Sequence, residues 1–427
     1  MTSVNEKSMK FNKRVKVNFD GGDLTGDAGI LLYQEFNNVI GLHQAIEEIV
    51  QIKDDIIHRR HENHDVIMQK IYQNAAGYDA DDHADNLRHD PAFTTILNKP
   101  ELASQPTISR LNQQLNKETV KQFQEVNRTI IDRFHELEEP KKLVLDIDSS
   151  NSPTYGDQYG SSYNPHYGEN GYHPIFMFEG ETGDCLKASL RAGNVYTSRQ
   201  IVAFVGPELK RLRKKYPNIK IIIRGDSGFA TPKLYELCEK QSVDYVIRLK
   251  ANQRLQRISS EFENEIVSDP EVDIHEDHHV FYRKFTYKAN SWDKSRTVMM
   301  KLEKPADQLL FVPTFVVTTL EDDSPKDTVQ FYAERGKMEN YIKEGKLGFA
   351  FGKMSSTEFE INANKLQIAV LAYNLNNGLR RFCMPKKMKK HQINTIRTCF
   401  IKIAGRVIRS GRYITFKLSS SSLYKDA

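Results

Sequence analysis

Acidic residues stand where two apolar segments of this sequence end. Residues 143–149 are aliphatic until the segment acquires Asp146 and Asp148. A second aliphatic run, residues 221–223, leads to Asp226, which lies between two glycines. Carboxylates on a buried strand are costly unless they are paired or bind a metal ion. Open α/β sheets bind ligands just beyond the carboxyl ends of their strands. Both segments are therefore candidates for a metal site.

Spacing does not separate the two early aspartates. Residues two apart share one face of a strand, so Asp146 and Asp148 point the same way. We prefer Asp148 because it lies nearer the open end of the strand. The alternative is that both acids cap the strand and accept hydrogen bonds from loop amides. For Asp226 the alternative is an ordinary turn, since its neighbours Gly225 and Ser227 are common in turns.

A third acid, Glu339, belongs to a polar group with helical spacing. One helix is predicted from residue 328 to about residue 346, and it contains Tyr332, Arg335, Glu339 and Lys346. At ~100° per residue, these four residues fall within an arc of roughly 60°. A carboxylate flanked by two cations and a phenol suits a phosphodiester held against metal ions. The alternative is a solvated face on which Glu339 pairs with Lys343.

The charge of the chain is unevenly distributed. The 427 residues carry a formal net charge of +5, but residues 376–427 contain thirteen Lys and Arg against one acid. That segment therefore has a net charge of +12, and the rest of the chain −7. A basic block on an otherwise acidic protein is the expected footprint of a polyphosphate partner. The alternative is a solubilising tail, but interleaved apolar residues such as Ile401 and Phe416 favour a folded, DNA-binding segment.

Two other bulk properties restrict the class of protein. No run approaches the ~20 apolar residues of a membrane span, and the polar first sixteen residues lack the apolar core of a signal peptide, so we expect a cytoplasmic protein. The four cysteines never fall in CxxC spacing. Neither a disulfide framework nor a zinc knuckle is indicated.

The order of the predicted elements after residue 141 indicates the fold class. Three strands are expected to form an antiparallel meander, followed by helix, strand, helix and strand. Their predicted bounds are 143–148, 172–179 and 185–191 for the meander, then 198–216, 219–224, 232–241 and 243–249. This α/β order is that of a ribonuclease H-like core with a mixed five-stranded sheet. A strand-rich segment, roughly residues 280–319, precedes the helix of Glu339 and is expected to be an inserted β domain.

The first 140 residues are expected to be mostly helical. Apolar residues recur at three- and four-residue spacing over residues 28–36, 42–50, 65–73 and 120–137. A Pro and hydroxyl residues at 105–109 indicate another helix start, where backbone NH groups and Arg110 could meet a DNA phosphate. A plain helix cap explains the same residues equally well.

Two further features are candidate ligand contacts. Trp292, the single tryptophan, stands among polar residues in the β-rich segment and could stack on an unpaired base, although core packing is the favoured interpretation. His166 and His173 flank the end of a Gly- and Tyr-rich segment at residues 155–172, which is expected to be a hairpin or a substrate loop. A zinc site there is not favoured, because no cysteine or second pair of ligands accompanies the two histidines.

The spacing Tyr332-x2-Arg335-x3-Glu339-x6-Lys346 resembles the signature of DDE-type bacterial insertion-sequence transposases, and all four positions match. Further similarity to one subgroup lies in residues 19–25, 145–149, 224–230 and 340–344, so the resemblance covers about residues 17 to 380. It implies a ribonuclease H-like catalytic domain with a β insertion before the glutamate. It also implies that Asp148, Asp226 and Glu339 form the catalytic triad, with Asp146 as the alternative first acid.

Together, the patterns and the resemblance predict five consecutive parts. These are a helical N-terminal DNA-binding or dimerisation domain (1–140), the first part of the ribonuclease H-like core (141–250), a β-rich insertion (251–322), the second part of the core with the Glu339 helix (323–384), and a basic C-terminal segment (385–427).

The expected chemistry is phosphodiester hydrolysis and transfer. Two divalent ions ~4 Å apart can activate a water or a 3′-hydroxyl and stabilise the leaving oxygen, and oxygen-only ligands suit Mg2+ or Mn2+. Phosphate oxygens are expected to contact Tyr332, Arg335, Lys343 and Lys346. The resemblance implies double-stranded DNA as a partner, both the terminal inverted repeats of the element and the target DNA. It also implies a second copy of the chain, in a homodimeric synaptic complex. The expected location is the bacterial nucleoid.

Two alternative functions stay open from the sequence. One is a ribonuclease H-like DNA endonuclease without strand transfer, which the long insertion and the helical N-terminal domain make less favoured. The other is a DNA-binding relic that no longer cleaves, against which stands the presence of all three acids. Joining of a 3′-hydroxyl end separates the first alternative from a transposase.

Overall fold

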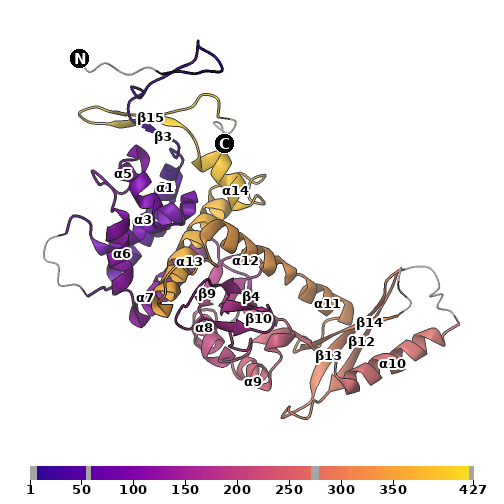
Figure 1. Ribbon diagram of the computed structural model, residues 1–427. Helices are drawn as coiled ribbons and strands as arrows, with labels where there is room; N and C mark the ends of the chain where they lie inside the picture. The colour runs from indigo at the N-terminus through magenta and orange to yellow at the C-terminus, as the bar shows by residue number, and fades with distance from the viewer. Residues whose placement is uncertain (1–6, 54–58, 271–277, 307, 309, 423–427) are drawn as a thin grey trace. The chain divides into compact units, whose positions relative to one another are not determined.

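The computed structural model describes residues 7–53, 59–270, 278–306, 308 and 310–422 (Figure 1). The chain divides into two compact units, one of residues 135–343 and the other of residues 1–134 together with residues 344–427. The candidate acids all belong to the first of these, and so the sheet of that unit is the element that positions them.

An eight-stranded mixed sheet forms the centre of unit 135–343. Its strand order is β12-β13-β14-β11-β10-β4-β8-β9. The strands are β4 (Lys142–Ser149), β8 (Ile175–Glu179), β9 (Cys185–Ser189), β10 (Lys220–Gly225), β11 (Asp244–Leu249), β12 (His279–Tyr287), β13 (Arg296–Lys304) and β14 (Val312–Thr318).

The predicted meander and the two strands that follow it are confirmed. Strand β4 pairs antiparallel with β8, and β8 antiparallel with β9. Strand β10 lies parallel to β4 on its other side, and β11 parallel to β10. The connections are α8 (Ile201–Lys215), the short helix η1 (Ser227–Phe229) and α9 (Pro232–Lys240). The aliphatic residues of β10 are buried, as expected for a central parallel strand whose two faces are covered.

The strand predicted at 172–179 is two strands. Strand β7 (Glu169–Tyr172) pairs with β5 (Ser152–Pro153) and β6 (Ser162–Asn164) in a separate small sheet. Strand β8 begins only at Ile175. Pro174 separates the two strands, because proline lacks the amide hydrogen that a continuing ladder requires.

The strand-rich segment extends the central sheet. The sequence had indicated a separate β domain. Strand β14 pairs antiparallel with β11, and β13 pairs with both β14 and β12. Apolar side chains from the predicted core and from the insertion pack in one cluster, which consists of Ile222, Val246, Met299, Val316, Leu320 and Val329. The segment also begins with a helix, α10 (Gln253–Val267), capped by Asn252, whose side chain accepts from the amide of Leu255.

The single helix predicted from 328 to about 346 is also two helices. Helix α11 (Pro325–Ala333) ends at Glu334, and α12 (Gly336–Phe349) begins two residues later. Gly336 is a weak helix former, and the side chain of Arg335 pairs with Asp148 on the sheet. Tyr332 and Glu339 therefore lie on different helices, and the arc calculated for one continuous helix does not apply across the break.

The other unit is mainly helical, and the N-terminal helices predicted from the sequence are confirmed. The helices are α1 (Ile30–Ile40), α2 (Leu42–Ile49), α3 (Asn63–Ala76), α4 (His83–Asn86), α5 (Pro91–Ile96), α6 (Gln105–Gln114), α7 (Lys117–Leu137), α13 (Phe359–Phe382), α14 (Ile393–Ile396) and η2 (Arg397–Ile401). Over the ranges that the structure describes, none of the helices has both the length and the apolar composition of a membrane crossing.

The C-terminal part of the chain folds with the N-terminal helices. Helix α13 packs against α3 and α1, and Gly378 lies so close to Phe134 and Phe36 that a Cβ atom would approach their rings within 2.5 and 2.8 Å. The predicted division placed residues 359–382 in the second part of the core, whereas in the structure α13 groups with the N-terminal helices.

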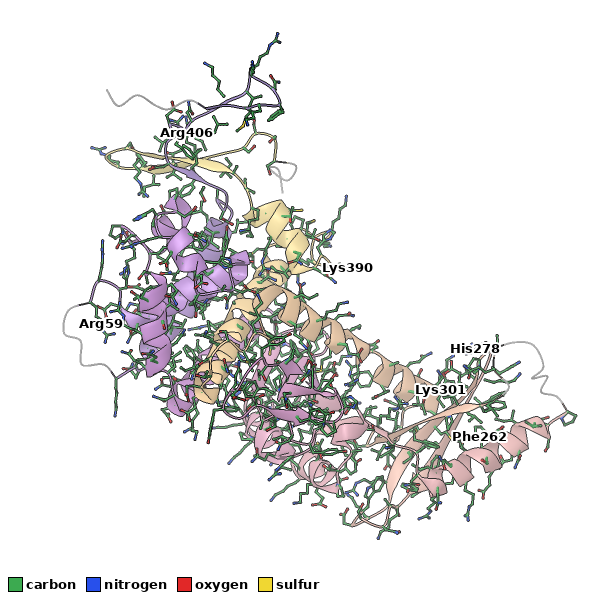
Figure 2. The ribbon with its side chains drawn as sticks, viewed as in Figure 1. Arg59, Phe262, His278, Lys301, Lys390 and Arg406 are labelled. Carbon is green, nitrogen blue, oxygen red and sulfur yellow. The ribbon has the colours of Figure 1, made fainter. Side chains whose placement is uncertain are left out.

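A small sheet joins the two ends of this unit. Strand β15 (Gly405–Arg409) pairs with β16 (Ile414–Leu418) and with β3 (Leu24–Thr25). Strands β1 (Lys7–Ser8) and β2 (Lys16–Val17) form a separate pair. Arg406, which is labelled in Figure 2, lies on β15. Its partner on β16 is Lys417. The basic segment is therefore a folded hairpin over residues 405–418, as its interleaved apolar residues indicated.

Candidate active site

Strands β4 and β10 bring two of the predicted acids to the same edge of the sheet. The two strands are parallel and in register, with Arg224 opposite Asp146 and Gly225 opposite Ile147. The next residues along each strand therefore emerge side by side at the carboxyl end. In this way β4 positions Asp148 and β10 positions Asp226.

Asp146 lies two residues before Asp148 on β4, further from the edge of the sheet, and forms an ion pair with Arg224. Both side chains are buried, and the guanidinium donates from Nε to Oδ1 at 2.6 Å and from NH2 to Oδ2 at 2.8 Å. NH1 of Arg224 also donates to the carbonyl oxygen of Phe331 at 2.7 Å, which connects β10 to α11. Burial raises the pKa of Asp146, although Arg224 opposes that shift. Both carboxylate oxygens of Asp146 are thus occupied within the protein.

Asp148 is in a different environment. Its Oδ1 accepts from the amide of Ser149 at 2.9 Å, and NH2 of Arg335 lies 2.7 Å from its Oδ2. Burial raises the pKa of Asp148 to about 6; Arg335 counteracts the shift, whereas Asp226 and Glu339 add to it. Asp226 and Glu339 therefore lie near enough to Asp148 to influence its charge.

Asp226 caps the turn that follows β10. Its Oδ1 accepts from the amide of Gly228 at 2.9 Å. A Cβ atom on Gly228 would lie 3.0 Å from that oxygen and 3.0 Å from Cγ2 of Thr197. The glycine therefore allows the turn to close tightly, and its amide holds one carboxylate oxygen of Asp226.

Arg335 connects two of the acids. Besides Asp148, it approaches Glu339, whose Oε1 lies 3.6 Å from NH1. Burial lowers the pKa of Arg335, but the surrounding groups, Asp148 foremost, outweigh it and raise the value. Glu339 lies in the first turn of α12, and its side chain is 68% exposed. It is therefore available to a ligand in a way that Asp146 is not.

The remaining members of the predicted group differ in position. Tyr332 is half-buried and packs against the apolar cluster of β10, β11, β13, β14 and α11, and burial raises its pKa. Lys343 is exposed on α12, and Lys346 lies in the last turn of that helix. The division between the two units falls between Lys343 and Glu344, so Lys346 belongs to the other unit.

A cavity of about 820 Å³ opens at Asp148 and Asp226. Its wall includes His166 and Tyr167 from the loop between β6 and β7, as well as Arg248 and Lys250 at the end of β11. Burial raises the pKa of Tyr167, and the charges of Asp148 and Asp226 add to the shift. The segment at 155–172, expected to be a hairpin or a substrate loop, therefore supplies part of this wall.

Sequence reasoning missed Tyr167, Arg248 and Lys250. The last two had a signal, because β11 is the third parallel strand and its carboxyl end must reach the same edge as Asp148 and Asp226. Tyr167 had none, since its position depends on how the loop folds. His173 lies in the same wall with Nδ1 2.8 Å from the carbonyl oxygen of Val195, and burial lowers its pKa.

Comparison with known proteins decides the family. Residues 7–427 match the family described as transposase DDE domain group 1. The chain is a DDE transposase. No curated protein matches it. Among solved structures, a cryo-EM structure of a piggyBac transposase synaptic complex with hairpin DNA is similar, with 13% sequence identity, a TM-score of 0.46, and coverage of 87% of this chain and 78% of that chain.

The three candidate acids of this transposase suit hard divalent cations. Asp148, Asp226 and Glu339 offer carboxylate oxygens, which Mg2+ and Mn2+ prefer, whereas zinc sites usually include histidine or cysteine. One oxygen each of Asp148 and Asp226 is held by a backbone amide. Such bonds orient ligands from the outer shell of a metal site.

Two residues expected to contact DNA lie elsewhere in the transposase. Trp292 is only 6% exposed, with the rings of Tyr235 and Tyr287 edge-on at 5.5 and 5.4 Å. Base stacking is therefore not available to it, and core packing, the favoured interpretation, is what the structure shows. Arg110 is exposed on α6, where NH2 donates to Oγ1 of Thr107 at 3.2 Å.

Proposed function

We propose that this transposase cleaves DNA at the ends of its own element and joins those ends to target DNA, with Asp148, Asp226 and Glu339 as the metal ligands. The observation that carries the proposal is the convergence of Asp148 and Asp226 from two parallel strands on one cavity, with Arg335 between Asp148 and Glu339. Bound Mg2+ or Mn2+, two ions by analogy with other phosphodiester-transfer sites, would supply the activated nucleophile and the charge that stabilises the leaving oxygen.

The proposed core is ribonuclease H-like. In support, strands β9-β8-β4-β10-β11 are consecutive in the sheet, with three antiparallel strands followed by two parallel ones. This is the order expected for that fold from the sequence pattern. Strands β12 to β14 then form the insertion before the helix of Glu339.

Asp146 has a positioning role in this proposal. Because Arg224 takes both of its oxygens, it is a poor candidate for a metal ligand. Its pair with Arg224 instead joins β4 to β10 one step below Asp148 and Asp226, and extends to α11 through Phe331. The pair thereby fixes the spacing of the two strands that present the acids.

Arg335 serves two purposes in turn. It neutralises Asp148, whose charge would otherwise be costly at its depth of burial. A guanidinium can also hold two oxygens of one phosphate in a planar fork. We propose that Arg335 transfers its donors from Asp148 to the scissile phosphate when Asp148 becomes a ligand. Tyr332, Lys343 and Lys346 are proposed to contact phosphates nearby, and Arg110 to contact DNA on the other unit.

The proposed partners are double-stranded DNA and a second copy of the chain. The hairpin of β15 and β16 supplies exposed cations for the DNA backbone, among them Arg406 and Lys417. A homodimer is proposed for the complex that brings two ends together, in the bacterial cytoplasm.

Cleavage and joining on DNA from either side of this gene test the proposal. The purified chain, a labelled fragment carrying the element's end, a target plasmid and Mg2+ or Mn2+ are incubated, and products are separated on a denaturing gel. The proposal predicts both nicked ends and covalent joining to the plasmid. Cleavage without joining would support an endonuclease instead, and binding without cleavage would support a non-cleaving relic.

A further inference from the structure

Two histidines and an aspartate meet in the helical unit, in a site that does not include the carboxylates at the sheet edge. His43 lies in the first turn of α2, and His64 and Asp65 lie in the first turn of α3. One ligand atom of each lies within 4.8 Å of the other two. Residues 50–62 separate the two helices in sequence, so the cluster is formed by folding and not by local spacing.

The donor atoms are separated by nearly the distances of a metal site. Nε2 of His43 lies 3.9 Å and Nε2 of His64 lies 3.7 Å from Oδ1 of Asp65. Zinc binds histidine nitrogen and carboxylate oxygen at ~2.0–2.2 Å, so tetrahedral ligands are ~3.3–3.6 Å apart. The two histidine–aspartate separations therefore exceed these values by only a few tenths of an ångström.

Hydrogen bonding does not explain this arrangement. Separations of 3.7 and 3.9 Å are too long for hydrogen bonds. Among the residues that the structure describes, none forms a hydrogen bond with the buried Nε2 of His43. A buried polar atom in that state is costly and calls for an explanation. The two imidazole rings lie with their centroids 5.5 Å apart, and both of their Nε2 atoms approach the same carboxylate oxygen.

The two carboxylate oxygens of Asp65 have different neighbours. Asp65 is itself buried, and Nζ of Lys99 lies 2.5 Å from its Oδ2. Lys99 thus pairs with Oδ2 of Asp65, and Oδ1 faces the two histidines.

An approach route for an ion lies beside the cluster. His64 also lines a polar cavity of about 340 Å³, together with Glu47, Glu62 and Arg59. Arg59 is labelled in Figure 2. Glu47 lies one helical turn beyond His43 on α2. A water from this cavity can complete a fourth coordination position.

We propose that His43, His64 and Asp65 bind one zinc ion that connects α2 to α3. Two imidazole nitrogens and one carboxylate suit zinc and similar transition metals more than Mg2+. The site is therefore distinct in metal preference from the oxygen-only set proposed for catalysis. Its role is structural, since binding to the folded state alone stabilises that state.

The test measures zinc on the full chain carrying D148N and D226N, so that the sheet-edge carboxylates do not contribute. The protein is stripped with chelator, dialysed against zinc and analysed for bound metal by mass spectrometry, and binding is titrated by competition with a chromophoric chelator. We expect one zinc per chain, and a visible absorption band of tetrahedral Co2+ when cobalt replaces zinc.

Matched variants locate the site. H43Q and H64Q remove one ligand each, and H89Q changes an exposed histidine of the same unit. Loss of a direct ligand should weaken zinc binding by at least the roughly 10- to 100-fold that loss of an outer-shell partner costs, whereas H89Q should leave it unchanged.

A variant that is less stable can still be tested by measuring its thermal unfolding with and without zinc. Zinc should raise the unfolding temperature of the parent and of H89Q, and should not raise that of H43Q or H64Q. The proposal is overturned if the parent binds no zinc, or if H43Q and H64Q bind zinc as tightly as H89Q. Neither result depends on DNA cleavage, so failure here leaves the proposed transposition activity untouched.

Discussion

Arg224 and Asp146 face each other across two parallel strands and form a buried ion pair through two hydrogen bonds, of 2.6 and 2.8 Å. Because of this pair, Asp146 and Asp148 have different environments, although they lie only two residues apart in the sequence. Asp146 is fully engaged inside the sheet, whereas Asp148 reaches the cavity that Asp226 also lines. Replacing Asp146 should therefore affect the protein differently from replacing Asp148.

We predict that Asp146→Asn destabilises the fold. The substitution removes the charge that compensates a buried guanidinium, and breaking such a pair costs roughly 3–5 kcal/mol. Urea unfolding followed by circular dichroism measures the loss. Asp148→Asn is the comparison: it should lose less stability, because Arg335 keeps Glu339 as a second carboxylate partner, and it should lose metal-dependent cleavage. Equal stability of Asp146→Asn and wild type would show that Arg224 does not depend on this charge.

The sequence could not distinguish these two aspartates for a physical reason. Residues two apart on a strand share one face, so the pattern around Asp146 and Asp148 is the same for either assignment. The difference arises from Arg224, which is 78 positions away in the chain. Its partner is determined by the register of β4 and β10, and register is a long-range property.

The raised pKa of Asp148 predicts a pH dependence of metal binding. Its folded value is about 6, above the ordinary value of 3.8, mainly because of burial. In metal-free protein the proton is therefore held between about pH 4 and 6, and this group's contribution to stability is lost as the pH rises through 6. A metal ion must displace that proton, so the affinity for Mn2+ should fall by roughly tenfold per pH unit below 6. Calorimetric titrations at pH 5 and 7.5 measure the affinity for Mn2+, and equal affinities at the two pH values would contradict the prediction.

We predict that Arg335→Lys impairs cleavage more than DNA binding. Lysine retains the charge but not the planar fork that can pair with Asp148 or with two phosphate oxygens. Loss of one charge-assisted hydrogen bond, at roughly 1.5–3 kcal/mol, corresponds to a rate reduction of about tenfold to a hundredfold. Single-turnover cleavage rates and filter binding measure the two effects. Lys337→Arg, at an exposed neighbouring position, is the control and should cleave at the wild-type rate.

The break after α11 shows what helical periodicity does not reveal. Tyr332, Arg335 and Glu339 have the spacing of one helix, and the sequence predicts one. The actual break depends on Gly336 and on the attraction between Arg335 and Asp148, a partner on a strand far away in the chain. The sequence therefore shows that these residues are close along the chain, but not how their side chains are oriented relative to one another.

Cations of the C-terminal hairpin should determine the salt dependence of DNA binding. We predict that replacing Arg406, Arg409, Arg412 and Lys417 together by Gln weakens binding. The slope of log affinity against log salt should become shallower by about 0.9 for each phosphate that is no longer neutralised. Fluorescence anisotropy over a salt series measures the slope. Lys121→Gln, on an exposed face of α7, is the control, and an equal slope for the quadruple variant and wild type would exclude the hairpin as a DNA-binding element.

Truncation of the whole basic segment is a poorer experiment. Ile393, Ile396 and Ile401 are buried, and a Cβ atom on Gly29 would clash with the backbone of Phe400. Removing this segment would therefore expose the core of the helical unit. The sequence indicated a folded basic segment from its charge and its interleaved apolar residues. It could not indicate that the segment packs on N-terminal helices, because a single sequence does not show which distant elements meet.

Asp148, Asp226 and Glu339 are proposed to bind the metal ions needed to cleave the ends of the element. The most direct measurement is Mg2+-dependent cleavage of a labelled terminal-repeat fragment by wild type, Asp226→Asn and Glu339→Gln, with binding of the same fragment measured in parallel. Both variants should bind the fragment as wild type does and yield no cleavage product. Full cleavage by either variant in Mg2+ would contradict this proposal.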